Sequence, residues 1–379
     1  MNRVPLTECW YFVGTAPKKY DGEKRYISTG ALDKDHINES DVEMVTFDNR
    51  PSRANLEVSE GDILFAKMAS TEKTFLVDSL AANDIYSTGF CAVRAKEDKI
   101  IPKCLYYFLS STLFLDQKDK NSSGATQKAI TNAGLSKIDI NLPNIDEQQD
   151  FVSQMDGLST LIMARREQLA KLDELVKSRF IELFGDYDLS HIRGDWKSIS
   201  EIGKVVGGAT PKTNIEEYWD GEYRWITPAE LSADSGYIYD SVRKLTKAGV
   251  DSCSLQEMPV DTVILSSRAP IGKVAIAGNT FYCNQGFKNI ICNNEVLPRY
   301  LYTVLLLNTE YLNSLGRGAT FKEISKSIVE NIRIPVPPIE LQNAFAAFVE
   351  QTDKSKLAIQ KSLEKLETLK KALMQKYFG

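Results

Sequence analysis

Residues 145–185 read IDEQQDFVSQMDGLSTLIMARREQLAKLDELVKSRFIELFG, and residues 339–379 read IELQNAFAAFVEQTDKSKLAIQKSLEKLETLKKALMQKYFG. The two segments align without a gap at an offset of 194 residues, and both end in Phe-Gly. The same register already holds upstream, where Gly-Ala-Thr occurs at residues 124–126 and again at 318–320. An ungapped match over about 60 residues indicates a tandem duplication, so the chain is predicted to be an internal repeat with pseudo-two-fold character.

Both segments carry apolar residues at steps of three and four, which predicts a long helix in each. Neither contains an internal proline after its entry turn, and at 1.5 Å per residue each helix is expected to be about 55–60 Å long. The narrow apolar stripe is typical of a coiled-coil seam, so we predict one antiparallel coiled coil. The residues predicted to form the helix pair and to serve partner docking are Phe151, Met155, Leu158, Ile162, Leu169, Leu172, Val176, Phe345, Val349, Ile359, Leu363, Leu366 and Leu373.

Charge also favours pairing of the two helices with each other. Residues 145–184 carry a net charge of −3, whereas residues 339–379 carry +2. Opposite signs favour the mixed pair over self-pairing, although exposed ion pairs contribute little each. The alternative is that each helix packs only on its own domain, but a rod of this length exceeds a 140-residue domain with a radius of gyration of about 14 Å.

The segments in front of the helices are predicted to be β-rich. The expected organisation is a first domain at 1–144, a central helix at 145–185, a linker at 186–195, a second domain at 196–338 and a C-terminal helix at 339–379. Alternating and β-branched residues predict an α+β fold. Expected strands lie at 61–68, 85–93, 138–142, 223–226, 262–266, 273–277, 288–292 and 332–336, and expected short helices lie at 102–115 and 298–315.

Composition indicates a globular protein without conspicuous affinity for polyanions. Of 379 residues, 43% are hydrophobic and the net charge is −5, which argues against disorder and against indiscriminate nucleic-acid binding. Six cysteines without a CxxC pair and without a cationic leader predict reduced thiols in a cytoplasmic protein. No apolar run approaches the ~20 residues of a membrane span, so no membrane association is expected.

Sequence motifs for catalysis are absent. The chain has no GxxxxGK[ST], GxGxxG, HExxH or GxSxG motif, no Asp/Asn-Pro-Pro-Tyr of an amino-methyltransferase, and only two histidines. Cys283 is predicted to be a buried strand cysteine rather than a nucleophile. We therefore expect a binding protein without catalytic residues and without a metal site.

Four loops of the second domain combine small, amide and basic residues. They lie at 207–213, 266–273, 284–288 and 317–322. Backbone N–H groups, hydroxyls and Lys or Arg can contact phosphates, and Arg, Asn and Gln can contact base edges. Any one such loop is more often an ordinary solvated turn, so only their number favours nucleic-acid contact.

The chain resembles the DNA specificity subunit of type I restriction-modification systems. Two variable domains alternate with two similar long helices, and the second half is the closer match. Its matching segments are GGATP at 207–211, WITP at 225–228, SRAPIG at 267–272, NQGF at 284–287 and IPVPP at 334–338 followed by ELQ at 340–342. The first half departs from this pattern, with AKMAS at 66–70 and STGF at 87–90.

The resemblance implies two target recognition domains, each of which reads one half of an asymmetric, bipartite double-stranded DNA target. It also implies that the helices fix the spacer and dock two methyltransferase subunits, which restriction/translocase subunits join. S-adenosylmethionine, ATP and Mg²⁺ are then expected on the partner subunits, with no cofactor in this chain. The candidate DNA-contact residues are Lys67, Ser70, Lys73, Gln127, Lys128, Thr210, Lys212, Arg268, Lys273, Gln285, Lys288, Arg317 and Lys322.

Two other readings remain open from the sequence. A specificity subunit of a related fused or orphan restriction-methylation system has the same architecture. A helical protein-interaction scaffold with β-rich arms, which binds proteins and has no DNA specificity, is the other.

Overall fold

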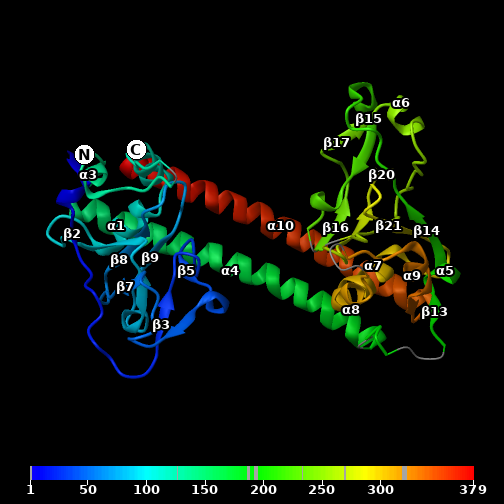
Figure 1. The fold of residues 1–379 in the computed structure, drawn as a ribbon, viewed down its shortest axis with the longest axis horizontal. Coiled ribbons are helices and arrows are strands. Elements are labelled where there is room, and N and C mark those ends of the chain that lie inside the picture. The colour runs from blue at the N-terminus through cyan, green and yellow to red at the C-terminus, as the bar shows by residue number, and fades with distance from the viewer. Residues whose placement is uncertain are drawn as a thin grey trace. The chain divides into compact units, whose positions relative to one another are not determined.

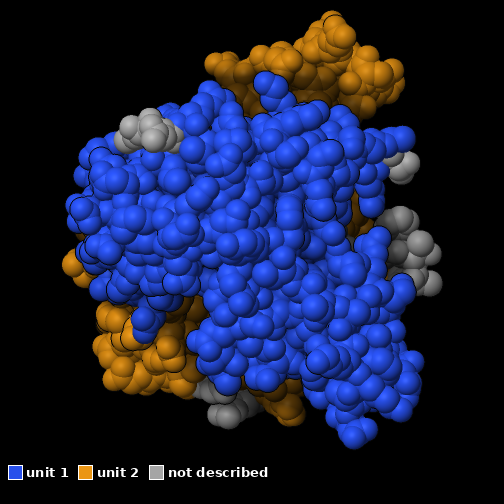
Figure 2. Space-filling model, turned by 90° about the vertical axis from the view of Figure 1, so that its left-hand side faces the viewer, with its two compact units in different colours: residues 1–168, 359–379 blue, residues 169–358 orange. Residues whose placement is uncertain are grey.

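The computed structural model describes residues 2–125, 127–185, 188–191, 195–232, 234–268, 270–317 and 322–379. The chain forms two compact units, shown in separate colours in Figure 2. Unit 1 contains residues 1–168 and 359–379, and unit 2 contains residues 169–358. Figure 1 labels many of the elements of each unit.

The two longest helices are α4 (Ile145–Phe184) and α10 (Ile339–Phe378), and they pack together. In unit 1 the ring of Phe151, near the start of α4, lies 5.0 Å from the ring of Phe378 at the end of α10. In unit 2 the ring of Phe345, near the start of α10, lies 5.6 Å from that of Phe184 at the end of α4. The helices therefore run antiparallel, which confirms the predicted pairing.

The predicted apolar stripe is buried or half-buried along both helices. In unit 1, Phe151, Met155 and the α10 residues Met374 and Phe378 belong to one core. The equivalent core of unit 2 contains the end of α4 and the start of α10. Each unit is thus built around the start of one long helix and the end of the other.

Unit 1 contains two four-stranded sheets, and short pairs of strands complete it. The first sheet has the order β6 (Glu43–Val45), β3 (Lys24–Ile27), β10 (Ile85–Ser87) and β7 (Ala54–Leu56), and the second has the order β2 (Trp10–Phe12), β11 (Phe90–Ala95), β8 (Ile63–Ala66) and β9 (Thr74–Leu76). The two-stranded pairs are β1 (Asn2–Pro5) with β12 (Asp139–Leu142) and β4 (Leu32–Asp33) with β5 (His36–Ile37). Its short helices are α1 (Pro102–Leu109), α2 (Thr112–Lys120) and α3 (Asn132–Leu135).

Unit 2 is built from a five-stranded and a three-stranded sheet. The larger has the order β14 (Gly203–Gly207), β21 (Lys288–Cys292), β18 (Val263–Leu265), β19 (Val274–Ala277) and β16 (Asp234–Ile238), and the smaller has the order β17 (Arg243–Leu245), β15 (Trp219–Ile226) and β20 (Tyr282–Cys283). Strand β13 (Lys197–Ser198) pairs with β22 (Arg333–Ile334). The short helices are α5 (Ile199–Ile202), α6 (Lys247–Asp251), α7 (Pro298–Leu307), α8 (Thr309–Ser314) and α9 (Lys326–Asn331).

The strand pairings repeat between the units. The order β2-β11-β8-β9 corresponds to β14-β21-β18-β19. Strand β3 pairs with β10 in parallel and with β6 in antiparallel fashion, and β15 pairs in the same two ways with β20 and β17. The structure therefore confirms the α+β class and extends the internal repeat into segments whose sequences align poorly.

Three predicted elements are interrupted in the structure. The helix expected at 102–115 is two helices, because the Ser111 hydroxyl accepts the Phe114 N–H at 3.1 Å and caps a new helix. The helix expected at 298–315 ends at Leu307, where Asn308 donates its side-chain amide to the Val304 carbonyl at 2.9 Å. The strand expected at 85–93 breaks before Phe90 and contributes to both sheets of unit 1.

Candidate nucleic-acid interface

Backbone hydrogen bonds join two of the sequence-predicted loops of unit 2 to each other and to Ile324, which follows the predicted loop at 317–322. Residues 318–321 of that loop lie outside the described residues. The Ser267 N–H donates to the Gly286 carbonyl at 2.7 Å, which joins the β18–β19 loop to the segment before β21. The Ile324 N–H donates to the Ser267 carbonyl at 2.9 Å, which adds the segment that follows α8. These bonds involve no side chain, so they place few demands on the residues that the bonded positions carry.

The remaining loop joins this group through Gly208 and Thr210. A Cβ on Gly208 would lie 2.1 Å from the Cys283 carbonyl oxygen, so only glycine permits this approach. Two residues on, the Thr210 hydroxyl donates to Gln285 Oε1 at 2.5 Å. Burial in strand β20 raises the pKa of the Cys283 thiol to about 12, which confirms a buried strand cysteine and disfavours a thiolate nucleophile.

A carboxylate lies among the cations of this loop cluster. Arg268 Nε donates to Glu323 Oε2 at 3.0 Å, and Lys288 Nζ donates to Glu323 Oε1 at 3.3 Å. Partial burial alone would raise the pKa of Glu323. The hydrogen bond from Arg268 and the charge of Lys288 outweigh it and hold the pKa below its usual value. Glu323 is therefore ionised near neutral pH.

Two predicted contact lysines are used to fix loops. Lys273 Nζ donates to the carbonyl oxygens of Pro228 at 3.2 Å and Leu231 at 2.5 Å. Lys73, at the equivalent place of the β8–β9 loop, donates to the Thr29 carbonyl at 2.7 Å. Each ammonium ties its loop to a preceding segment of the same unit, so these two lysines have structural partners before any ligand arrives.

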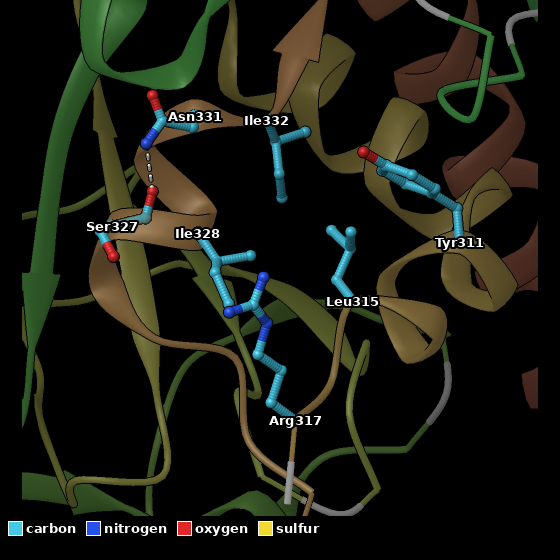
Figure 3. Close-up of a pocket in the computed structure, with 7 residues that line it drawn as sticks. All are labelled: Tyr311, Leu315, Arg317, Ser327, Ile328, Asn331 and Ile332. Carbon is cyan, nitrogen blue, oxygen red and sulfur yellow. Dashed lines mark hydrogen bonds between the residues drawn. The ribbon is translucent and has the colours of Figure 1, made fainter.

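Arg317 lies at the edge of the cluster and lines a pocket of about 350 Å³ (Figure 3). The pocket is formed by α8, α9 and residues next to them, and its lining residues are Tyr311, Leu315, Arg317, Ser327, Ile328, Asn331 and Ile332. Lys322 is exposed one residue before Glu323. Lys212 is also exposed, and its carbonyl accepts the Trp219 indole N–H at 3.3 Å, which places it beside the smaller sheet.

Unit 1 builds the same loop framework from different side chains. The Lys67 N–H donates to the Gly89 carbonyl at 3.0 Å, and the Ile130 N–H donates to the Lys67 carbonyl at 2.8 Å. The Ala69 N–H donates to the Lys128 carbonyl at 2.9 Å. Lys67, Ser70 and Lys128 are thereby brought together, and Gln127 is exposed beside Lys128.

Helix α2 fixes this first loop through two adjacent charged residues. Lys118 is 2% exposed, and its ammonium donates to the carbonyls of Ala66, Met68 and Thr71 at 3.1, 3.0 and 2.7 Å. Asp119 accepts the Ser70 N–H at 2.9 Å on both carboxylate oxygens. Ser70 has a φ of 55°, a left-handed conformation that is unfavourable for a residue with a side chain. The two charges therefore hold the loop in a shape it would not adopt alone.

Sequence reasoning missed Glu323, Lys118 and Asp119. Each contacts a loop that lies between 35 and 55 residues away in the chain. Lys118 also occupies a helix whose neighbouring charges, Asp116 and Lys120, suggest a solvated face. No local pattern distinguishes such residues from surface charges, so only the fold reveals them.

Each unit thus presents a loop cluster that carries hydroxyl, amide and cationic groups on a hydrogen-bonded backbone. Such groups can contact phosphates and base edges. Across the described parts of the chain, no group of three His, Cys, Asp or Glu residues is placed to hold a metal ion. Within the same parts, no helix combines the length and the apolar character needed to cross a membrane.

Comparison with known proteins adds a family likeness to this geometry. Residues 14–173 and 194–371 match the family model of the type I restriction modification DNA specificity domain. The MjaIX specificity subunit of a type I restriction enzyme from Methanocaldococcus jannaschii is 41% identical over 210 residues, which cover 54% of this chain and 48% of that protein. The chain thus spans about half the length of this relative.

A second relative and one solved structure cover more of the chain. The putative type I restriction enzyme MjaX specificity subunit of the same organism is 26% identical over 83% of this chain and 76% of its own length. A solved structure, from work on complex assembly and conformational transition of the type I R-M system, superposes with a TM-score of 0.62. The superposition covers 99% of this chain and 97% of the other chain. At 20% sequence identity the likeness is one of fold.

Proposed function

Because this chain belongs to the type I restriction modification DNA specificity family, we propose that it directs a methyltransferase and restriction complex to an asymmetric, bipartite DNA sequence. In this proposal each unit reads one half-site through its own loop cluster. The observation that carries it is the repeated loop framework. Lys67 and Ser267 make equivalent backbone bonds, and so do Gly89 and Gly286, whereas the exposed side chains around them differ.

Two domains that recognise different DNA sequences require the same backbone arrangement with different side chains on it. Phosphate contacts position a protein on the duplex, and side chains at base edges set the sequence. Arg268 and Gln285 belong to the residue types that read guanine and adenine edges in the major groove. Among the lysines, Lys128 and Lys322 are exposed and suited to phosphates.

We further propose that the chain is non-catalytic and that its chemistry resides in partners. The curated relatives are specificity subunits of type I restriction enzymes. Methyltransferase subunits would dock on α4 and α10, which would also set the spacer, and restriction/translocase subunits would join that assembly. S-adenosylmethionine, ATP and Mg²⁺ would be bound by those subunits. A net charge of −5 disfavours strong binding of DNA phosphates by this chain alone. It therefore supports the proposal that partner subunits supply much of the phosphate contact.

The test is an exchange of one domain. The chain is co-expressed with its methyltransferase subunits, and the methylated motif is mapped by sequencing of the host DNA. Residues 196–338 are then replaced by the equivalent domain of another specificity subunit, while 1–195 and 339–379 stay unchanged. We expect one half of the motif to change and the other half to remain. A motif that changes in both halves would refute the proposal that each unit reads its half-site independently. Methylation or binding without any sequence preference would favour a protein-interaction scaffold.

A further inference from the structure

The loop cluster of unit 2 contains one feature that is unexpected in a surface for a polyanion. Glu323 is a carboxylate that holds both Arg268 and Lys288, at 3.0 and 3.3 Å. The two cations come from different loops, one between β18 and β19 and the other at the start of β21. A single acidic side chain therefore forms ion pairs with two of the cationic residues that the sequence predicts to contact DNA.

The ion pair between Arg268 and Glu323 is accessible enough to exchange partners. The side chains of Arg268 and Glu323 are 48% and 35% exposed, whereas Lys288 is 14% exposed. Exposed pairs of this kind contribute only about 0–1 kcal/mol, since solvent screens them. Arg268 can therefore leave Glu323 for another anion at a small energetic cost. The charge of Lys288 still lowers the pKa of Glu323 when Arg268 has left, so the carboxylate stays ionised near neutral pH.

The fold does not require an acidic residue at this position. A β-bridge joins Arg268 to Glu323 in unit 2, and the equivalent bridge in unit 1 joins Met68 to Ala129. The following residues, Ile130 and Ile324, each donate a backbone N–H to the equivalent carbonyl. Unit 1 thus closes the same framework with alanine, which has no charge. The carboxylate therefore belongs to the loop cluster of unit 2 alone and is not required by the fold that the two units share.

We propose that Glu323 is a specificity-determining residue of the second reader, an internal anion that weakens its binding to non-target duplex. This inference rests on the proposed DNA-reading function. A phosphate that approaches Arg268 or Lys288 must displace Glu323 and then lies close to its negative charge. Non-target DNA offers phosphate contacts only and bears this cost in full. On a target sequence Arg268 would donate to a base edge, which carries no net charge and is repelled less by Glu323. The cost then differs between the two duplexes and increases the ratio of their affinities.

The experiment uses the complete complex with its methyltransferase subunits. Two duplexes are compared, one with the motif that the wild-type complex methylates and one with the same bases scrambled. Dissociation constants are measured across a salt series for wild type, Glu323→Gln and Glu323→Ala, where alanine reproduces the residue of unit 1. Glu295→Gln is the matched control, because Glu295 pairs with Lys197 at 2.9 Å in the same unit and outside the cluster.

Both Glu323 variants are expected to bind the scrambled duplex about three- to tenfold more tightly at low salt, the scale of one freed surface charge. The slope of log K against log salt should steepen by about 1, one more phosphate contact. Target affinity should change less, so discrimination falls.

The inference is overturned if Glu295→Gln has the same effect, which would indicate net charge alone. It is also overturned if the Glu323 variants lose affinity for both duplexes at an unchanged slope, since Glu323 would then only orient Arg268. Failure of the proposed function itself would look different: wild type would not distinguish the two duplexes.

Discussion

Replacement of Phe378 by alanine should destabilise unit 1, although the residue belongs to the last turn of α10. Its side chain is 5% exposed, and its ring lies 5.0 Å from that of Phe151 and 5.3 Å from that of Phe108. Loss of a buried phenyl ring costs about 3–5 kcal/mol through lost transfer energy and the cavity left behind. A helix end can relax into part of this cavity, so we expect about 3 kcal/mol, the lower end of that range.

Native-state hydrogen exchange with peptide resolution measures this effect where it occurs. A loss of about 3 kcal/mol increases the population of open states roughly 100-fold. Faster exchange is expected in α1 and β12 of unit 1, while α7 of unit 2 keeps its protection. The matched control is Leu369→Ala on the same helix, because Leu369 is 48% exposed and its truncation should cost within about 0.5 kcal/mol.

Two results would contradict the reasoning. If Phe378→Ala accelerates exchange only in the last turn of α10, the ring is not part of the unit 1 core and the helix end merely frays. If α7 loses as much protection as α1, then the core of unit 1 around Phe151 and Phe378 and the core of unit 2 around Phe345 and Phe184 are not independent in stability. Either outcome would require a different account of how the long helices contribute to the two cores.

Three further substitutions test the contribution of buried polar side chains to stability. Lys118→Met should cost about 2–4 kcal/mol in urea unfolding, since three loop carbonyls lose a cationic donor, whereas Lys120→Met on the exposed face should be nearly neutral. Gln342→Leu should cost a similar amount, because Gln342 is fully buried and its amide bonds Leu297 N–H and the carbonyls of Glu295 and Pro337; Gln351→Leu is the exposed control. Burial raises the pKa of Asp84 to about 6, so the folded state binds the extra proton and stability should fall as pH rises from about 4 to 6. Asp84→Asn should abolish that slope and stabilise the protein at pH 7 by at most about 3 kcal/mol, and a slope that persists would assign it to another group.

The sequence predicts those parts of the fold that depend on local periodicity. The stripe from Phe151 to Val176 has helical spacing that tertiary packing does not override, so the bounds of α4 agree with expectation to within one residue. The sequence does not predict the break at Ser111, because a serine in an apolar helical pattern caps a new helix only when the chain turns there. The loops of the candidate interface were recognisable by composition, but their arrangement depends on bonds between distant segments such as Ser267 and Gly286.

The two copies differ most in their front parts and least in their long helices, and the structure gives a physical reason. The loops meet through backbone hydrogen bonds, which are indifferent to side-chain identity. Substitutions such as Met68 against Arg268 or Ala129 against Glu323 therefore leave the frame intact.

The helices are constrained twice. Phe151 packs on Phe378 in one unit, and their repeat equivalents Phe345 and Phe184 pack together in the other. A change in either helix alters the core of one domain as well as the contact between helices, and buried aromatic positions tolerate few replacements. The readers are consequently free to diverge, while the helices that join their cores are not.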